Sequence, residues 1–203
     1  MRCRILVITG DHSRADATKW VGGYTDDDLE LHAEMRHALE SLPGYEFDFL
    51  VQHDRLVGRL TGDPPDLVLN FCDTGFSNVA TQEPHVPALL DLLGIPYTGA
   101  GPAGLALCYD KHVVGLVAGA LGVPVPRSLL LSAGKLPSHG EALFPGLIKP
   151  VHGDGSVGIV PESVVRSPGE AKAHLRWLWR TLPEAEALWQ EYLPGPELGL
   201  TLI

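Results

Sequence analysis

Two short runs of branched apolar residues constrain most strongly what this chain can fold into. One extends from Arg4 to Thr9, and the other, from Asp66 to Phe71, is continuous rather than alternating. A continuous apolar run is typical of a parallel strand that is covered on both faces of its sheet. The alternating segment from Tyr45 to Val51 predicts a third strand. These segments favour an open α/β layer in the first hundred residues.

Helices are predicted between and after these strands. Thr25 and Asp28 have the spacing of a capping box, and the acidic run 26–28 suits the positive end of a helix dipole. The apolar positions that follow are spaced as one helical stripe, which Pro43-Gly44 ends. These positions are Leu31, Met35, Ala38, Leu39 and Leu42. A second helical pattern at 86–93 leads into a short strand at 94–97.

The second half of the chain predicts a different, smaller sheet. A helix from Asp110 to Leu121 ends at Gly122, and a strand follows at 127–131. A strand at 143–149, a glycine-rich turn and a returning strand at 157–160 predict a hairpin-like unit. A helix at 168–181 precedes two strands, at 186–191 and 197–203. The chain stops inside this last strand, so we expect further polypeptide downstream.

Composition excludes several classes of protein. The chain has 203 residues, of which 45% are hydrophobic and 20% charged, and it holds no apolar run near the ~20 residues of a membrane span. Its net charge of −10, with no basic patch, disfavours nucleic acid as a partner. Cys3, Cys72 and Cys108 are widely spaced, which disfavours disulfides and thiolate zinc sites and fits a cytoplasmic protein. The N-terminal apolar run is too short for a signal peptide.

Nucleophilic and histidine-based metal chemistry are also disfavoured. The nine histidines show no HxxxH or HExxH spacing, and His32 and His37 lie off a common helical face. Ser156 lacks the G-x-S-x-G elbow, and no base is visible in the sequence for Cys72. These residues are interpreted as structural or surface groups.

The glycine-rich segment 153–158 is the first candidate for a binding site. Its sequence, GDGSVG, matches the dinucleotide fingerprint G-x-G-x-x-G. The dinucleotide turn must enter a helix, whereas this segment is predicted to continue as a strand. We interpret it as a glycine loop whose backbone N–H groups close over phosphates. A plain hairpin turn is the alternative.

Three further features are weak signals individually and indicate a binding site only in combination. Lys149 ends an apolar strand just before the glycine loop, where a surface lysine is the alternative. Lys111 begins a helix, where a cation opposes the dipole unless an anion lies nearby. The polar link at 190–197 can offer backbone groups to a purine and a carboxylate to ribose, or form a solvated turn.

Together these motifs resemble the ATP-grasp superfamily and, within it, the D-alanine:D-alanine ligase family. LGIPYTG at 93–99 is similar to the same family motif, Asp110-Lys111 to its DK, and GVPVP at 122–126 to its G-x-P-x-P. Ile148-Lys149-Pro150 with the glycine loop resembles VKP…GSSVG. The similarity extends from about residue 66 to the end of the chain.

This resemblance implies roles for individual residues. Lys111 and Lys149 would contact ATP phosphates, and Gly155 and Ser156 would cover them. Gln190, Glu191 and Leu193 would hold adenine, and Glu197 would contact ribose. The family's magnesium ligands, its phosphoryl-stabilising arginine and its nucleophile-binding groups would lie beyond Ile203. No catalytic or metal-binding residue is therefore assigned within the chain.

The sequence departs from the family pattern at the positions that orient the substrate. Asp73-Thr74 stands where the family has HG, and Gly155-Ser156 stands where it has two serines. Gln190 replaces the usual hinge glutamate and can still accept a hydrogen bond from an adenine amino group. Specificity for a D-alanine dipeptide is therefore in doubt, whereas adenine binding is not.

The resemblance implies an α/β protein that is α+β in its second half. We expect an N-terminal α/β domain at 1–100, a connecting helical segment at 101–124, and the small ATP-grasp subdomain with the start of the next at 125–203. The implied function is an ATP- and magnesium-dependent carboxylate–amine ligase that acts through an acyl phosphate on amino-acid-like substrates. A non-catalytic ATP-grasp interaction module is the alternative, and homodimerisation stays open.

Overall fold

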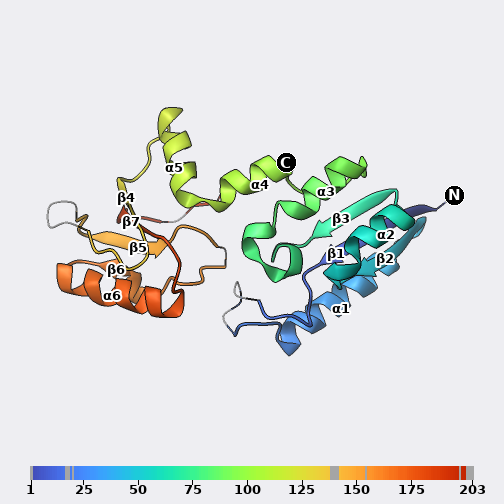
Figure 1. Ribbon diagram of the computed structural model, residues 1–203, viewed down its shortest axis with the longest axis horizontal. Coiled ribbons are helices and arrows are strands. Elements are labelled where there is room, and N and C mark those ends of the chain that lie inside the picture. Colours follow the sequence, from blue (N-terminus) through green and yellow to red (C-terminus); the bar gives the residue numbers. More distant parts are fainter. Residues whose placement is uncertain are drawn as a thin grey trace. The chain divides into compact units, whose positions relative to one another are not determined.

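The computed structural model in Figure 1 describes residues 2–16, 19, 21–137, 142–153, 155–196 and 198–199. The chain divides into two compact units, residues 1–109 with 153–157 and residues 110–152 with 158–203. The first holds a parallel sheet and the second an antiparallel one, which confirms the predicted fold class. The boundaries near residues 100 and 125 stay predictions.

The first unit is built on a three-stranded parallel sheet in the order β2-β1-β3. Its strands are β1 (Cys3–Thr9), β2 (Tyr45–Leu50) and β3 (Leu67–Phe71). The central strand β1 is buried from Ile5 onward because it has a neighbour on each side and side chains packed on both faces. Tyr97 adds one parallel bridge to Val68, so the expected short strand at 94–97 contributes a single residue pair.

Helices surround this sheet. They are α1 (Asp26–Glu40), α2 (Leu56–Gly62), α3 (His85–Leu93) and α4 (Pro102–Tyr109). Short 3-10 segments lie at His53–Arg55, Phe76–Asn78 and Ala80–Gln82. Leu6 and Ile8 of β1 form one core with Leu60 of α2 and Leu90 of α3. Helix α2 was not predicted, because its seven residues are too few to show a clear period.

The predicted capping box of α1 is confirmed, but its apolar stripe is not a buried face. The Thr25 hydroxyl accepts a hydrogen bond from the Asp28 backbone, and the Asp28 carboxylate accepts one from the Thr25 backbone. No residue of α1 is fully buried, and Leu31 is 63% exposed. The predicted helix is present, and its stripe is only partly covered, because α1 contacts the edge strand β2.

The second unit contains a four-stranded antiparallel sheet in the order β4-β7-β5-β6. The strands are β4 (Ser128–Leu131), β5 (Gly146–Pro150), β6 (Val164–Val165) and β7 (Ala187–Glu191). Helix α5 (Lys111–Ala120) precedes them, a 3-10 turn lies at Pro161–Ser163, and α6 (Pro168–Thr181) lies between β6 and β7. No helix in the described part of the chain is long and apolar enough to span a bilayer.

One face of this second sheet packs on α6 and forms the core of the unit. Ile148 of β5 and Trp189 of β7 pack with Leu175 and Leu178 of α6. The Trp189 indole N–H donates a hydrogen bond of 2.8 Å to the Leu143 carbonyl. A Cβ at Gly146 would collide with that indole ring, so glycine is required at this position for the tryptophan to cross the strand.

The returning strand expected at 157–160 was wrong. β5 pairs instead with Val164–Val165, after a 3-10 turn. Gly155, Ser156 and Gly158 have φ values of 59°, 58° and 77°, in the left-handed region, which an extended strand cannot accommodate. The last strand, expected at 197–203, falls mostly outside the described residues, and residues 198–199 are not in a strand.

Candidate functional site

Lys149 and Gln190 lie on the same face of the second sheet. The antiparallel register pairs Lys149 with Leu188 and Leu147 with Gln190. Paired residues point to the same side, and successive residues alternate. Ile148 and Trp189 point toward α6, so these four residues point away from it. We call this second side the distal face, and it consists of Ser128, Leu130, Leu147, Lys149, Leu188 and Gln190.

The charge of Lys149 sits in a partly desolvated environment. Burial lowers the pKa of the half-buried Lys149, and the positive charge of Lys111 lowers it further. Both causes disfavour the ammonium form, so an anion that contacted both lysines would relieve an existing electrostatic cost. Two cations close enough to influence each other suit a ligand with several negative charges.

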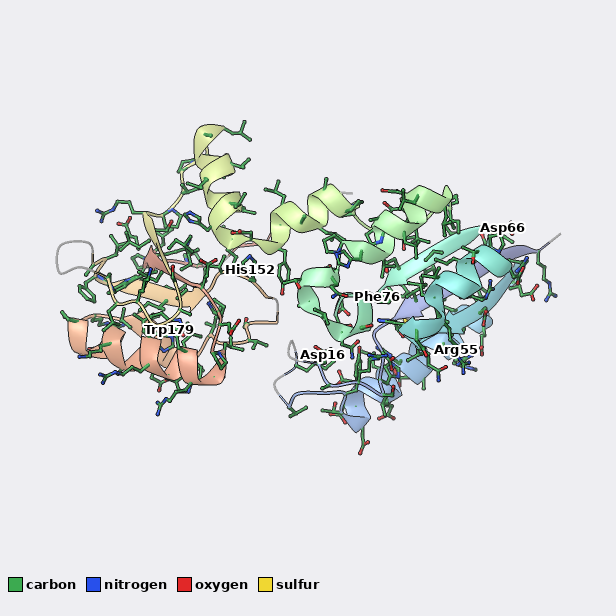
Figure 2. All side chains as sticks on the ribbon, in the orientation of Figure 1. Asp16, Arg55, Asp66, Phe76, His152 and Trp179 are labelled. Carbon is green, nitrogen blue, oxygen red and sulfur yellow. The ribbon has the colours of Figure 1, made fainter. Side chains whose placement is uncertain are left out.

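Lys111 is fixed to the strand that carries Lys149. Its backbone N–H donates to the carbonyl oxygen of Val151 at 3.2 Å, and its Nζ lies 3.4 Å from that same oxygen. Asp110 caps the helix: its Oδ1 accepts hydrogen bonds of 2.9 Å from the backbones of His112 and Val113. The helix that begins at Lys111 therefore starts beside the end of β5, as Figure 2 shows near His152.

Both ends of the glycine loop are anchored in the second unit. At its beginning, the Val151 backbone N–H donates to the Glu186 carbonyl at 3.0 Å. At its end, Gly158 is buried against Pro150 and Leu178, where its positive φ and the absence of a Cβ permit the close approach. Gly155 and Ser156, between these anchors, are exposed. Consecutive left-handed residues present backbone N–H groups that can bind anions.

The residues of the polar link at 190–197 differ in the groups that they can present to a ligand. Gln190 presents its amide on the distal face. The Glu191 side chain lies on the opposite face, 3.4 Å from Arg127 Nε, and its backbone N–H donates to the Arg127 carbonyl. Leu193 is 63% exposed just beyond β7. Glu197 lies outside the described residues.

The relatives of this chain point to one family of ligases. The D-alanine–D-alanine ligase of Gloeobacter violaceus is 27% identical over 205 aligned positions, covering 98% of this chain and 62% of that protein. The corresponding enzyme of Acidiphilium cryptum is 29% identical, covering 98% and 61%. An uncharacterized protein of Sinorhizobium fredii, y4sG, is 32% identical over 119 residues, covering 59% and 34%. No protein-family model matches the chain.

Solved structures of such ligases share its fold. D-alanine–D-alanine ligase from Bacillus anthracis, complexed with ATP, superposes with a TM-score of 0.71 at 20% identity, covering 96% of this chain and 58% of that one. The VanG D-Ala:D-Ser ligase of Enterococcus faecalis gives 0.60 at 16% identity, covering 96% and 64%. The chain is thus similar to D-alanine–D-alanine ligases over nearly all of its own length. It spans less than two thirds of the length of these relatives.

The first unit also holds a buried polar cluster at the carboxyl ends of β1 and β3, which sequence reasoning missed. Asn78 Oδ1 accepts a hydrogen bond of 2.9 Å from the Asp11 backbone N–H, and Asn78 Nδ2 donates one of 2.8 Å to the Asp11 carbonyl. The Thr74 hydroxyl donates to Asn78 Oδ1 at 3.1 Å. These groups satisfy one another, and the separation of 67 positions between Asp11 and Asn78 left no local signal of the contact.

The same edge brings Tyr24 against the altered family motif at Asp73-Thr74. A Cβ at Gly10 would collide with the Tyr24 hydroxyl and with Thr74, so the chain passes closely here. Burial raises the pKa of Tyr24 to about 12, although a hydrogen bond with Thr74 opposes this rise. Tyr24 is therefore a neutral phenol at physiological pH. The hydroxyl of Thr74 makes hydrogen bonds to Asn78 and Tyr24.

Cys72 has a histidine neighbour after all, but the pair is not a nucleophile and base. Its Sγ lies 3.7 Å from His53 Nε2. His53 Nδ1 accepts a hydrogen bond from the Ser77 backbone, so Nε2 carries the proton and donates to the Thr9 carbonyl at 2.7 Å. Burial, with nearby Asp73 and Glu83, raises the pKa of Cys72 to about 12. The thiol stays protonated, in keeping with the expectation against covalent catalysis.

A magnesium site is not formed by the part of the chain that the structure describes. Within those ranges, no group of three or more His, Cys, Asp or Glu side chains is arranged to hold a metal ion. The residues present therefore do not fit the metal that the family resemblance implies. The expectation that its ligands lie beyond Ile203 stays a prediction.

Proposed function

We propose that this chain is the nucleotide-binding part of an ATP-dependent carboxylate–amine ligase. The observation that carries the proposal is the proximity of the charges of Lys111 and Lys149, together with the position of Gln190 on the same distal face as Lys149. Two adjacent cations suit a polyphosphate, and an amide on the same face suits the edge of a purine. The family relationship supports ATP as the ligand.

Each candidate residue is proposed to act through the group that its position makes available. Lys111 and Lys149 neutralise phosphate charge, and the backbone N–H groups of Gly155 and Ser156 close over the phosphates. Gln190 accepts from the adenine amino group. Glu191 and Leu193 offer backbone groups, since the Glu191 side chain is directed to the other face of the sheet. The ribose contact from Glu197 remains a prediction.

The proposed reaction has two balanced steps. A substrate carboxylate oxygen attacks the γ-phosphorus of ATP, the bond to the β,γ-bridging oxygen breaks, and ADP leaves. An amine then attacks the carbonyl carbon of the acyl phosphate, inorganic phosphate leaves, and the nitrogen loses a proton to form the amide. Phosphoryl transfer depends mainly on position and charge neutralisation, which the two lysines supply on the protein side.

The substrates are proposed to be a small carboxylate and a small amine, such as amino acids. The departures at Asp73-Thr74 and Gly155-Ser156 change groups that in this family orient the first amino acid. We therefore leave the pair unassigned and propose a screen. ADP release by the complete gene product is measured with D-amino acids and with small carboxylate–amine pairs. Stimulation by at least one pair is expected, and none across the panel contradicts the ligase proposal.

A second candidate function is a non-catalytic interaction module. Helix α5 is apolar after His112, has no buried residue, and exposes Leu116 at 60%. An uncovered apolar helix face is typical of a protein contact. ATP binding by the complete gene product without turnover on any substrate pair would favour this candidate over the ligase.

A further inference from the structure

A cavity of about 620 Å³ lies at the β6 edge of the second sheet, between the 3-10 turn that precedes β6 and helix α6. Figure 1 shows β6 and α6 side by side. The volume of the cavity is in the range of sites for small organic molecules, about 300 to 1,000 Å³. None of the described residues that we propose to bind ATP lines it. The cavity is therefore a candidate site for a second ligand.

Much of the cavity wall is apolar or aromatic. Val160, Pro161 and Val164 come from the 3-10 turn and β6, and Ala173 and the half-buried Trp177 come from α6. Ala173 and Trp177 are four positions apart, so they lie on one face of the helix. A flat indole beside aliphatic groups suits a ligand with an aromatic or branched apolar body.

His174 belongs to the same wall and has an unused hydrogen-bond acceptor. The residue is only 3% exposed, and its ring stacks on Trp177 with the centroids 5.2 Å apart. Its Nε2 is shielded from solvent and has no hydrogen-bond partner among the described residues, so Nδ1 makes the hydrogen bond with the Ile148 backbone. Burial lowers the pKa of His174, which keeps the imidazole neutral and leaves a lone pair on Nε2. A buried acceptor without a donor is unfavourable, and a donor that enters from the cavity relieves this.

The charged groups at the rim of the cavity favour a cation over an anion. Glu162 is exposed there, and its negative charge acts on the imidazole of His174. Glu170 adds a second negative charge, but its oxygens accept hydrogen bonds from the Arg166 backbone at 2.8 Å and the Ser167 hydroxyl at 3.1 Å. The Arg166 side chain adds one positive charge. With two negative charges against one positive, Glu162 is the carboxylate left to pair with a ligand.

The edge of β6 does not offer its backbone to a further strand. The Val164 backbone N–H donates to the Pro161 carbonyl, and the Arg166 backbone N–H donates to the Glu170 carboxylate. Because these donors are used within the chain, an added peptide strand could not use them. The chemistry of the cavity therefore points to a small molecule.

We propose that this cavity binds a small organic amine in its ammonium form, with an aromatic or branched apolar body. The ammonium pairs with Glu162, and the apolar body packs on Trp177 and the aliphatic wall. Entry of the ligand shifts the indole that stacks on His174 and opens Nε2 to an N–H of the ammonium. Attraction of the cation to the indole face adds to the ion pair. The proposal does not depend on the proposed nucleotide function, because none of the ATP-binding residues takes part.

Three probes with one phenyl ring each separate charge from shape. Phenethylamine, phenethyl alcohol and phenylacetate are titrated into ¹⁵N-labelled protein at pH 7.5, without nucleotide. The amine is a cation at this pH, because an alkyl ammonium has a pKa near that of lysine, about 10.4. We expect it to shift the Trp177 indole N–H and the amides of residues 160–166. It should bind at least about threefold more tightly than the alcohol, and phenylacetate should bind most weakly.

Two variants with matched controls locate the binding. E162Q removes the charge at nearly constant size, and E184Q does the same at an exposed glutamate outside the cavity wall. A173L places a larger side chain on the wall, and R176L places one on an exposed part of α6 outside it. E162Q should weaken the amine about threefold and leave the alcohol unchanged. A173L should weaken both at least about threefold, and the two controls should match wild type.

The outcomes decide between this site and its alternatives. Tighter binding of phenylacetate than of phenethylamine would show that Arg166 selects the ligand and that the assignment to an amine is wrong. Equal amine affinity in wild type and E162Q, or shifts confined to other elements, would also contradict the proposal. If no probe shifts a residue of the cavity, the cavity is not a ligand site. Since no nucleotide is present, any of these failures leaves the nucleotide-binding proposal unaffected.

Discussion

Buried and half-buried polar groups have different environments in the two units. At the carboxyl edge of the parallel sheet, Asn78, Thr74 and the Asp11 backbone satisfy one another in a buried network. In the antiparallel unit, Lys149 is half-buried near Lys111. Burial and the charge of Lys111 both lower the pKa of Lys149. A satisfied network stabilises a fold, whereas a cation held at an electrostatic cost indicates a ligand. The comparison thus supports a stabilising role for the first cluster and is the basis of the binding role that we propose for the second.

The largest expected effect is a loss of stability from N78A. The substitution leaves the Asp11 N–H and C=O and the Thr74 hydroxyl without their buried partner, which should lower the free energy of unfolding by about 3 kcal/mol. Urea denaturation of the whole chain measures it, with Q52A, at an exposed amide, as the control. A loss below 0.5 kcal/mol (about the effect of a surface substitution) would show that the network is not a stabilising one.

An intermediate effect is expected from acid on the second unit. Burial lowers the pKa of His174, although its hydrogen bond with the Ile148 backbone opposes this. Below pH 6.5 the unfolded chain therefore takes up the proton first, and stability falls as the pH drops toward the folded-state pKa. The slope due to this one group is at most about 1.4 kcal/mol per pH unit.

H174Q sharpens that test, since glutamine keeps a donor for the Ile148 carbonyl but does not titrate in this range. Unfolding free energies at pH 7.0, 6.0 and 5.0 should fall less steeply in H174Q than in wild type. H37Q, at an exposed histidine, should behave as wild type. Identical slopes in wild type and H174Q would contradict the assignment.

The last of these predictions, which changes the fold least, concerns the rates at which two cysteine thiols are alkylated. Cys108 is exposed and Cys72 is buried, with its pKa raised to about 12. Iodoacetamide at pH 8 should alkylate Cys108 at least roughly a hundredfold faster than Cys72, followed by peptide mass spectrometry. Rapid alkylation of Cys72 in the folded protein would contradict this prediction and would make Cys72 a candidate nucleophile at the parallel sheet.

Local signals were sufficient for much of the fold. The Thr25 capping box, the helix at 168–181 and the apolar strands at 4–9 and 66–71 depend on neighbouring residues, and the structure confirms them. The strand predicted at 157–160 is absent because the turn that begins at Gly155 continues to Gly158, whose left-handed φ interrupts an extended strand. The helix with the apolar stripe is present as α1, but periodicity did not reveal how little of the stripe its neighbours cover.

The candidate site was predictable only in part, for a related reason. Motifs identified Lys149 and Gln190, but their common face follows from the pairing of β5 with β7, about forty residues apart in the sequence. The Asn78 network and the Asp110–His152 contact likewise join residues distant in the chain. Spacing within one element carries no information about such contacts.

The central claim is that Lys149, on the distal face, and the neighbouring Lys111 bind the phosphates of ATP. Chemical-shift titration of ¹⁵N-labelled protein with ATP tests it directly in wild type, K149M and K172M, the last at an exposed lysine on α6. Because the contacts are partly exposed to solvent, we expect a wild-type Kd of about 1 mM, with shifts on β5, β7 and the start of α5. K149M should weaken binding at least about tenfold, and K172M should not. Equal affinity in wild type and K149M, or shifts confined to other elements, would contradict the account.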